Sequence, residues 1–353
     1  MEINFDKQGI IKDYKFDRGI IKSAARLTYN EVEGYMNNSS VPDDSFKESL
    51  QASFILFNQL LKQRTQRGAL DFKIAEPTLK IDRDENVIDV IDRSRLTSHK
   101  LIEEFMLAAN IVAADFLEKN CKKGIFRVHG NPESIKIDRL SQTLKRRSIN
   151  WQGDIEDIQN LSFFLEKIQN RKDASILNTL ILQAMQRAEY TTENIGHFGL
   201  KYKKYTHFTS PIRRYPDLLV HRLIIATLSN EAVEDQELQG LLEYCSAQEK
   251  SAEFASKQVI QNLLCEYAAN FKGKSFKGFI TGVKDFGLFV DVPKLFTSGL
   301  LHVNDLPNDY YRYNARNYSL EGKRRGNKFS LGDEINIYIG DVRELEGKIS
   351  LYY

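Results

Sequence analysis

The sequence changes character at Gly273, and this change sets the number of domains to expect. Before Gly273, helical periodicity dominates the chain. After it, short segments of alternating apolar and polar residues are separated by glycines, which mark turns between strands. These glycines are Gly278, Gly282, Gly287, Gly299, Gly332 and Gly347. About 80 residues of this kind are typical of a small five-stranded barrel. We therefore predict two domains in this chain of 353 residues, with a boundary near residue 272.

The first domain, residues 1–271, mixes both kinds of periodicity, which predicts an α+β fold with a mixed sheet and several helices. Apolar residues at three-to-four spacing are typical of amphipathic helices. They predict helices at 45–66, 101–119, 155–170, 173–190 and 232–271. Alternating residues predict short strands within 2–35, 70–92 and 126–132.

Composition argues against two classes of protein. No apolar run approaches the length of a membrane span, and the N-terminus has no signal-peptide core. The three cysteines, Cys121, Cys245 and Cys265, lie too far apart for a CxxC metal site and form no disulfide framework. We therefore expect a cytoplasmic, monomeric protein without a membrane partner.

Charge is distributed unevenly, although the formal net charge is only +2. Residues 201–222 contain six Lys and Arg against one Asp, and residues 272–328 contain eleven against five acidic residues. The helix between them begins with an acidic segment. Basic regions offset by acidic helices are typical of nucleic-acid binders. Ordinary solvated surface explains the charges equally well.

The segment 205–222, YTHFTSPIRRYPDLLVHR, is the most informative for function. Arg213 and Arg214 follow a proline and precede Asp217 at a predicted helix start. Arginine presents several N–H donors in a rigid, permanently charged fork that matches phosphate oxygens. The segment therefore predicts a phosphate-binding loop.

Aromatic and basic residues are interleaved in the predicted barrel. Phe286 and Phe289 flank a glycine turn, Phe276 precedes them and His302 follows. Aromatic rings stack on unpaired bases while lysines follow phosphates, as in proteins that bind single-stranded nucleic acid. The alternative, which applies to any isolated phenylalanine, is a place in the barrel core.

The pattern GxITGVKDFGLFVDV…GLLHVNDL resembles the S1 RNA-binding domain, an OB-fold barrel. The resemblance implies that Phe276, Phe286, Phe289 and His302 lie on the RNA face. Glu344 and Lys348 stand where that family has a late aspartate and arginine, so Lys348 is also assigned to RNA binding.

Two further segments carry polar residues in suggestive positions. Glu103 and Asn110 are about two helical turns apart and share a face, next to Glu104, where they could bind sugar hydroxyls. The alternative is a glutamate placed favourably near the positive end of the helix dipole. Arg127 and His129 alternate on one face of a predicted strand, although such residues often only cap or pair.

Together these segments resemble the RNB family, the catalytic domain of ribonucleases II and R. The matching stretches are RGIIKSAARLTY (18–29), LIEEFMLAANIVAADFL (101–117), FRVHGNP (126–132) and HFGLKYKKYTHFTSPIRRYPDLLVHR (197–222). LPNDYYRY (306–313) points to the ribonuclease R branch. The resemblance implies hydrolysis of single-stranded or 3′-overhang RNA from its 3′ end, releasing 5′-monophosphates.

The resemblance also implies residue roles. Arg213 is expected to stabilise charge on the scissile phosphate, with Arg214 and Tyr215 supporting it or contacting the backbone. Glu103 or Glu104 is expected to hold the 3′-terminal ribose, a contact that distinguishes RNA from DNA. The remaining expected lining residues are Arg127, His129, His207 and Ser210.

One part of the family pattern has no counterpart in this sequence. The family uses Mg²⁺ held by aspartates in a segment of the form DxxDAxDxDDA, which precedes the RGxxxSxARLTY stretch. Here that stretch begins at Arg18, and the acidic residues at 43–44 and 82–92 lie in polar turns. We therefore expect no metal ligands in this chain, a missing front to the RNB domain, and no activity of the chain alone. A non-catalytic RNA-binding protein and a non-functional remnant remain alternatives. We also expect strands within 2–35 to lack sheet partners and the chain to be partly disordered before about residue 40.

Overall fold

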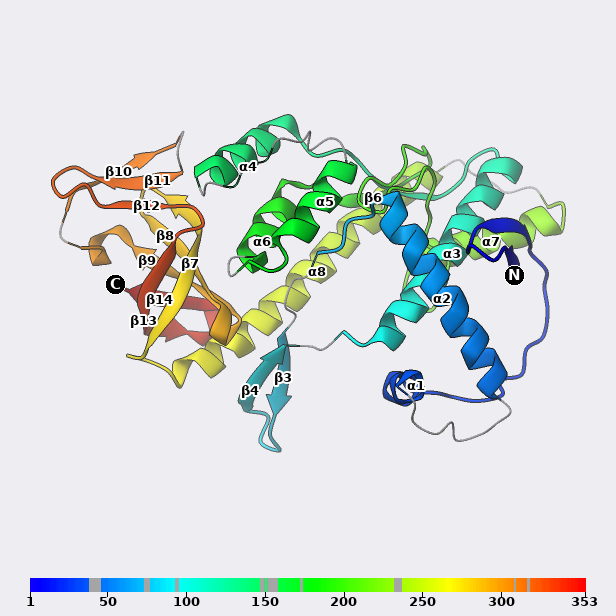
Figure 1. The fold of residues 1–353 in the computed structure, drawn as a ribbon, viewed down its shortest axis with the longest axis horizontal. Coiled ribbons are helices and arrows are strands. Elements are labelled where there is room, and N and C mark those ends of the chain that lie inside the picture. Colours follow the sequence, from blue (N-terminus) through cyan, green and yellow to red (C-terminus); the bar gives the residue numbers. More distant parts are fainter. Residues whose placement is uncertain are drawn as a thin grey trace.

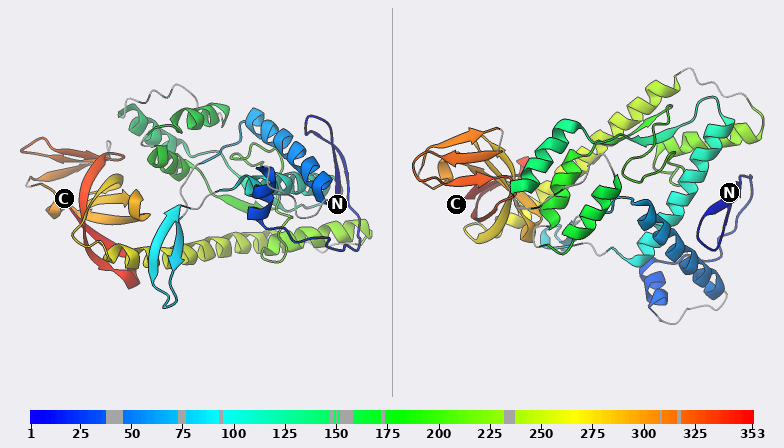
Figure 2. Two further views of the ribbon diagram at one scale, coloured as in Figure 1. Left: turned by 60° about the horizontal axis from the view of Figure 1, so that its bottom comes forward. Right: turned by 45° about the horizontal axis from the view of Figure 1, so that its top comes forward.

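The computed structural model describes residues 1–37, 46–72, 77–92, 95–146, 149, 151, 158–171, 174–231, 237–307, 309–315 and 318–353. It confirms the α+β class and the C-terminal five-stranded barrel. Figure 1 shows an elongated molecule with the N-terminal hairpin at one end and the barrel at the other. The helix α8 (Leu238–Ala269) runs along the long axis and connects the two ends (Figure 2). None of the described helices combines the length and apolar composition that a membrane span requires.

The N-terminal strands are better packed than predicted. Strands β1 (Glu2–Phe5) and β2 (Ile11–Lys15) pair with each other, so the expectation that they lack sheet partners was wrong. Phe16 is 7% exposed and packs among Val112, Phe116 and Phe208. This apolar contact fixes the hairpin against the helical core. After it the chain runs extended, and Ile20 and Ile21 are almost fully exposed.

The helix α1 (Tyr29–Met36) was not predicted. Its start carries a capping box, in which the Thr28 hydroxyl accepts from the Glu31 backbone N–H and the Glu31 carboxylate accepts from the Thr28 N–H. This is the S/T-x-x-E signature of a helix N-terminus. The sequence therefore contained the signal for α1.

Two long helices and a hairpin follow as predicted. Helix α2 (Lys47–Arg67) crosses α3 (Thr97–Asn120), whose central residues are almost all buried. Strands β3 (Pro77–Ile81) and β4 (Val87–Asp92) form an antiparallel pair around the Asp82 turn. The predicted strand residue Phe72 lies outside β3, and Ile74 lies outside the described residues.

The middle of the chain contains three short helices around a core of their own. They are α4 (Ser134–Arg146), which was not predicted, α5 (Ile158–Ile168) and α6 (Ala174–Ala184). Strand β5 (Phe126–His129) pairs with β6 (Ala188–Thr191). The predicted helix over 173–190 was therefore too long, because Ala188 belongs to β6.

The barrel closes in the order β13-β14-β9-β8-β7. Its strands are β7 (Ser275–Lys284), β8 (Gly287–Val292), β9 (Thr297–His302), β13 (Glu334–Arg343) and β14 (Lys348–Tyr352). Alternate residues of these strands are buried, because one face of each strand points into the closed barrel. A three-stranded sheet that was not predicted is inserted between β9 and β13. It consists of β10 (Tyr311–Asn314), β11 (Ser319–Gly322) and β12 (Lys328–Ser330).

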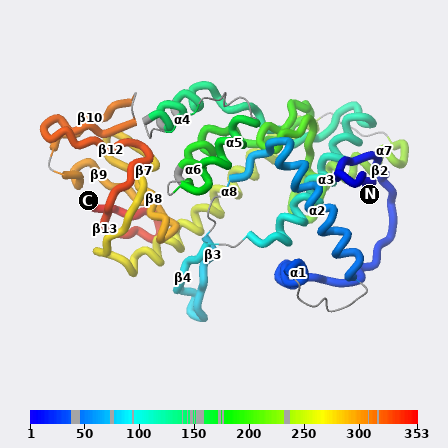
Figure 3. The backbone as a smooth tube through the Cα atoms, viewed as in Figure 1, coloured from blue at the N-terminus to red at the C-terminus, as the bar shows by residue number. Residues whose placement is uncertain are grey.

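The barrel is attached to α8 by direct packing. Cys265 and Ala268 on α8 are fully buried in the barrel core, and the Gln261 side chain donates a hydrogen bond to Thr297 Oγ1 at 3.2 Å. The last turns of the helix therefore belong physically to the barrel (Figure 3). The domain boundary placed at residue 272 stays a prediction.

Candidate nucleic-acid interface

The segment Ser210–Asp217, which we call the arginine loop, forms a closed loop at the start of α7 (Tyr215–Leu228). Asp217 is completely buried, and its Oδ1 accepts from the Ser210 backbone N–H at 2.8 Å and from Arg214 Nη2 at 2.7 Å. The Ser210 carbonyl oxygen accepts from the backbone N–H groups of Arg213 and Arg214. The loop is therefore held in one conformation from inside.

The two adjacent arginines of the loop have different environments. Arg214 is only 19% exposed in its side chain and pairs with Asp217, whereas Arg213 is exposed beside the fully exposed Ile212. Tyr215 is 46% exposed. Of the two roles expected for Arg214, supporting Arg213 or contacting the RNA backbone, its pairing with Asp217 within the loop favours the first, and the role stays a prediction. Arg213 and Tyr215 are the loop residues that an anionic ligand can reach.

Arg127 ties β5 to α8. Its guanidinium donates two hydrogen bonds to the Glu249 carboxylate, at 2.6 and 3.1 Å, and lies 4.5 Å from the centre of the Tyr190 ring. Its backbone N–H donates to the Tyr205 carbonyl oxygen at 2.8 Å. A bidentate pair of this kind fixes direction as well as distance. Arg127 therefore positions α8 against the sheet.

The histidines near the loop are held by neighbours and kept uncharged. His129 Nδ1 accepts from the Gly199 N–H at 2.9 Å, so Nε2 carries the proton and donates to the Gln186 carbonyl oxygen at 2.8 Å. His207 Nδ1 lies 2.7 Å from the Tyr190 hydroxyl oxygen. Burial lowers the pKa of His197 to about 3 and that of His207 to about 2, and nearby arginines act in the same direction. Both ring nitrogens of His129 are engaged by the backbone, so its predicted contact with RNA, which stays a prediction, would have to use the ring face or edge.

These two neutral histidines predict a stability that depends on pH. An unfolded histidine takes up a proton below pH ~6.5, whereas the folded state resists protonation, so lowering the pH favours unfolding. The contribution of these histidines to the free energy of unfolding is present above pH ~6.5 and is lost as the pH falls towards their pKa values in the folded state. Between pH 7 and 5.5 we expect the two groups together to cost about 2–3 kcal/mol of stability. Urea denaturation across this range measures it. His207→Gln should remove roughly half of the dependence. An undiminished dependence in this variant would refute the assignment.

Asn110 supports the interface from beneath. It is 2% exposed, its amide donates to the Tyr205 hydroxyl oxygen at 2.9 Å, and its Oδ1 accepts from the Phe208 backbone N–H at 2.9 Å. The prediction that Asn110 contacts sugar hydroxyls was wrong, because both ends of its amide are engaged inside the protein. Asn110 instead positions the chain on either side of His207.

Replacing Asn110 by alanine should therefore lower stability. The Phe208 N–H and the Tyr205 hydroxyl would each lose a partner in a buried place, which costs about 1–3 kcal/mol. Thermal and urea denaturation of Asn110→Ala measure the loss. Asn120→Ala, at the exposed end of the same helix, is the matched control and should cost much less. Equal stability of the two variants would contradict the role given to Asn110.

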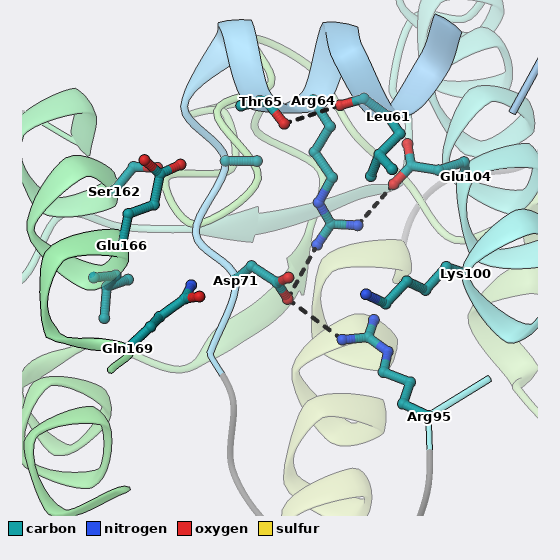
Figure 4. A pocket seen from close by; sticks show the side chains of 12 residues that line it. Leu61, Arg64, Thr65, Asp71, Arg95, Lys100, Glu104, Ser162, Glu166 and Gln169 are labelled. Atoms are coloured by element: carbon teal, nitrogen blue, oxygen red, sulfur yellow. Dashed lines mark hydrogen bonds and ion pairs between the residues drawn. The ribbon is translucent and has the colours of Figure 1, made fainter. Parts of the chain in front are cut away.

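Glu103 and Glu104 lie in a cluster of charges between α2 and α3. Figure 4 shows Glu104 in this cluster with Arg64, Asp71 and Arg95. Arg64 bonds both carboxylates, at 2.8 and 2.7 Å, and Arg95 also bonds Glu103. Glu104 is 4% exposed, and this burial raises its pKa. The pKa of Glu103 is lowered: burial opposes this, but the two arginines outweigh it. Glu104 borders a polar cavity of about 120 Å³ that is also lined by Asp71, Lys100 and Gln169.

A series of contacts runs from α2, beside this cluster, to the segment that precedes the arginine loop. Arg67 donates to the Leu200 carbonyl oxygen at 3.0 Å and lies 4.0 Å from the centre of the Tyr202 ring. Tyr202 stacks on Tyr205, with ring centroids 6.0 Å apart. Tyr205 in turn accepts from Asn110. Since Glu104 and Asn110 both lie on α3, one rigid helix positions both groups.

The outer face of the barrel presents the predicted aromatic residues, with one exception. Phe286 and Phe289 are 44% and 39% exposed and meet edge to face at 6.1 Å. His302 pairs with Gly287 in register, so it lies beside Phe286. Phe276 is 9% exposed and packs in the barrel core, so its prediction as an RNA contact was wrong. Its neighbours Ser275 and Lys277 face outward, which forces Phe276 inward.

Two charged residues near the C-terminal end of the barrel, Glu344 and Lys348, are exposed. Lys348 begins β14, and its Nζ lies 2.9 Å from the Glu346 carboxylate. Glu344 lies in the short 3₁₀ turn Glu344–Glu346. Lys348 remains available at the surface beside the outer face of β9, to which β14 is paired.

The described residues do not fit a divalent metal ion. Among them, no group of three or more His, Cys, Asp or Glu side chains is arranged to hold a metal. The Asp82 carboxylate accepts from the backbone N–H groups of Asp84 and Asn86, and Asp89 pairs with Lys80. These carboxylates therefore shape a hairpin turn, as predicted. Asp43 and Asp44 lie outside the described residues.

Three residues of the interface were missed in the sequence. Tyr190 and Glu249 hold Arg127 from strands and helices far along the chain, so no local spacing reveals them. Asp217 lies three residues after Arg214 at a helix start, a spacing at which side chains on a helix meet. That spacing could have identified the pair.

Comparisons with known proteins agree with this geometry. Residues 1–230 match the model of the RNB domain and residues 270–353 that of the S1 RNA binding domain. The chain is 33% identical over 365 residues to ribonuclease R of Escherichia coli K12, covering 99% of this chain and 45% of that protein. It is 34% identical over 361 residues to ribonuclease R of Thermotoga maritima, covering 99% and 51%. The chain also superposes on Mycoplasma genitalium RNase R with a TM-score of 0.94 at 26% identity, covering 99% of this chain and 56% of that one. That protein has been solved in its apo form and with ribose methylated single-stranded RNA. The chain thus spans about half the length of the curated relatives it matches.

Proposed function

Because this chain belongs to the RNB family, on its ribonuclease R branch, we propose that it binds RNA by its 3′ end and serves 3′-to-5′ exoribonucleolytic hydrolysis to 5′-monophosphates. In this proposal the arginine loop receives the phosphate next to the 3′-terminal nucleotide. The barrel binds the strand further towards its 5′ end. RNA is the partner, as it is in the solved complexes of Mycoplasma genitalium RNase R with single-stranded and double-stranded RNA.

The exposed Arg213 on a loop fixed from inside is the observation that carries the proposal. Catalysis by charge stabilisation needs a donor that is already in place before charge develops. The Asp217 carboxylate, the Ser210 carbonyl and Arg214 hold the loop, while the Arg213 side chain stays accessible. Arg213 therefore combines a preorganised backbone with a free guanidinium. Tyr215, beside it, offers an exposed ring to the terminal base or ribose.

Glu103 supports recognition of the terminal ribose better than Glu104. Both carboxylates pair with Arg64, and Glu103 also pairs with Arg95, but the Glu103 side chain is 33% exposed whereas that of Glu104 is 4% exposed. A carboxylate that accepts from a 2′-hydroxyl distinguishes RNA from DNA. We propose that Glu103 makes this contact and that Glu104 holds Arg64 in place.

The proposal includes Mg²⁺ as the ion of the reaction, since phosphodiester hydrolysis of this type uses metal ions to activate water and stabilise the leaving oxygen. The described residues do not supply its ligands, so we derive no step through the ion. The same observation favours a second candidate function, a non-catalytic RNA-binding protein that retains the arginine loop and the barrel.

One experiment separates the two functions. The chain is incubated with Mg²⁺ and an RNA that has a 3′ overhang and a labelled 5′ end. Release of mononucleotides with stepwise shortening from the 3′ end would establish exoribonucleolytic hydrolysis. Retention of intact RNA that weakens steeply with salt would establish binding without hydrolysis. Absence of both would refute the proposal.

A further inference from the structure

The turn between β11 and β12 carries a concentrated positive charge that the proposed function does not use. Lys323, Arg324 and Arg325 are consecutive and exposed. Gly326, with a φ of 69°, completes the turn in a conformation that favours glycine. We call Lys323–Asn327, together with Tyr310, the basic turn. It lies in the three-stranded sheet attached to the barrel (Figure 1).

Asp309 gives the basic turn its shape. Its carboxylate accepts from the backbone N–H groups of Tyr310 at 2.7 Å and of Arg324 and Arg325 at 2.9 Å each. A Cβ on Gly322 would lie 2.3 Å from Asp309 Oδ2, so this close approach requires glycine. The backbone N–H groups of Lys323, Arg324 and Arg325 are thus occupied, so these three residues can bind an anion only through their side chains.

Tyr310 and Arg324 form a stacked pair at the surface. Tyr310 is 64% exposed, and the Arg324 guanidinium lies 4.8 Å from the centre of its ring. An arginine stacked on an aromatic ring keeps its N–H edge free for phosphate oxygens. The other face of an exposed tyrosine can stack on an unpaired base. The pair therefore offers both contacts that single-stranded nucleic acid uses.

The charge balance favours an anionic partner. The turn has three cations against the single Asp309 carboxylate, and the adjacent Glu321 and Lys328 neutralise each other at 3.0 Å. Arg312 on β10 is also exposed. An acidic membrane surface would use the cations alone, whereas a single-stranded nucleic acid would also use the aromatic ring. The combination favours RNA.

The basic turn is close to the aromatic face of the barrel along the chain. Tyr310 follows His302 by eight residues, which limits their separation to about 28 Å. An RNA strand of a length that a single OB-fold binds can span such a distance. We propose that the basic turn is a second RNA site, where Arg324 and Arg325 bind phosphates of the strand and Tyr310 stacks on one of its bases. This inference rests on the proposed function, because it assigns a further contact to the same substrate.

The test measures how RNA binding by the full chain depends on salt. Each phosphate contact with a single strand contributes about 0.7 to the slope of log K against log salt. Arg324→Gln combined with Arg325→Gln should therefore make the slope shallower by about 1.4 for a single strand of about 25 nucleotides. Tyr310→Leu should weaken binding about fivefold and leave the slope unchanged. The fold should be retained, because the turn is held by backbone N–H groups that these variants keep.

Lys12→Gln combined with Lys15→Gln is the matched control. It removes two exposed positive charges from the N-terminal hairpin, at the opposite end of the molecule (Figure 3). The control should leave the slope unchanged. An unchanged slope in the arginine double variant, or an equal change in the control, would overturn the inference. If the arginine double variant loses binding to vesicles of phosphatidylcholine and phosphatidylserine while its RNA slope is unchanged, the turn binds a membrane surface. That result would also overturn the inference. If the parent chain binds RNA but the arginine variant is unaffected, only this inference falls; if the parent chain does not bind RNA, the proposed function falls with it.

Discussion

Replacing Arg214 by methionine should lower the free energy of unfolding by about 3–5 kcal/mol, because it removes one partner of a buried ion pair. Asp217 is completely buried and relies on two donors, the Ser210 N–H and Arg214. Its second oxygen, Oδ2, is buried and has no hydrogen-bond partner in the described part of the chain. Without Arg214 the buried carboxylate is left with one of its two donors, the Ser210 N–H. Urea denaturation should show a lower midpoint with an unchanged slope.

The neighbouring arginine provides the control for this prediction. Arg213 is exposed, so Arg213→Met should change the free energy of unfolding by no more than about 0.5 kcal/mol. The two substitutions remove the same group from adjacent positions and should differ several-fold in their effect on stability. Equal destabilisation by both variants would contradict the division of roles within the arginine loop.

Replacing Arg213 by lysine should reduce hydrolysis about 10²–10³-fold in any preparation that releases mononucleotides. Lysine keeps the charge but loses the planar fork that matches two phosphate oxygens. RNA affinity and its salt dependence should therefore change little. Arg213→Met removes the charge as well, and its salt slope should be shallower by about 0.7.

Two measurements on one protein distinguish these outcomes. Single-turnover release of mononucleotides reports the chemical step, and titration with labelled RNA at several salt concentrations reports binding. An equal loss of rate and affinity in Arg213→Lys would argue that Arg213 only binds the strand. Unchanged rate and affinity in both variants would remove Arg213 from the interface.

The barrel could be predicted from the sequence because its signals are local. Strand alternation and glycine turns repeat over the whole C-terminal segment, and neither depends on distant residues. The attached sheet was missed because its strands contain only three or four residues in a highly charged segment. The same alternation that predicted the barrel also determines that Phe276 points inward, between exposed Ser275 and Lys277. The family resemblance had assigned it to the outer face.

The interface could be predicted only in part, for a related reason. The arginine loop is contiguous, so its adjacent arginines are visible in the sequence. What separates Arg213 from Arg214 is burial, which comes from the packing of α7 against the core. Arg127 and Glu249 are 122 residues apart, and only the folded chain brings them together. Asn110 shows the same limit: its position on a helix face was read correctly, but the side chain faces the protein interior rather than RNA.

The proposal that the arginine loop binds the 3′ end of RNA and the barrel binds the strand towards its 5′ end can be tested by measuring the polarity of bound RNA. This measurement does not require hydrolysis. A photoreactive base is placed at either the 3′ or the 5′ end of a single strand, and the crosslinked peptides are identified by mass spectrometry. We expect the 3′-terminal base to crosslink to the arginine loop, at or beside Tyr215, and the 5′-terminal base to crosslink to the barrel face around Phe286 and Phe289. Crosslinks from the 3′-terminal base to the barrel, or equal labelling of both regions from both ends, would contradict the proposal.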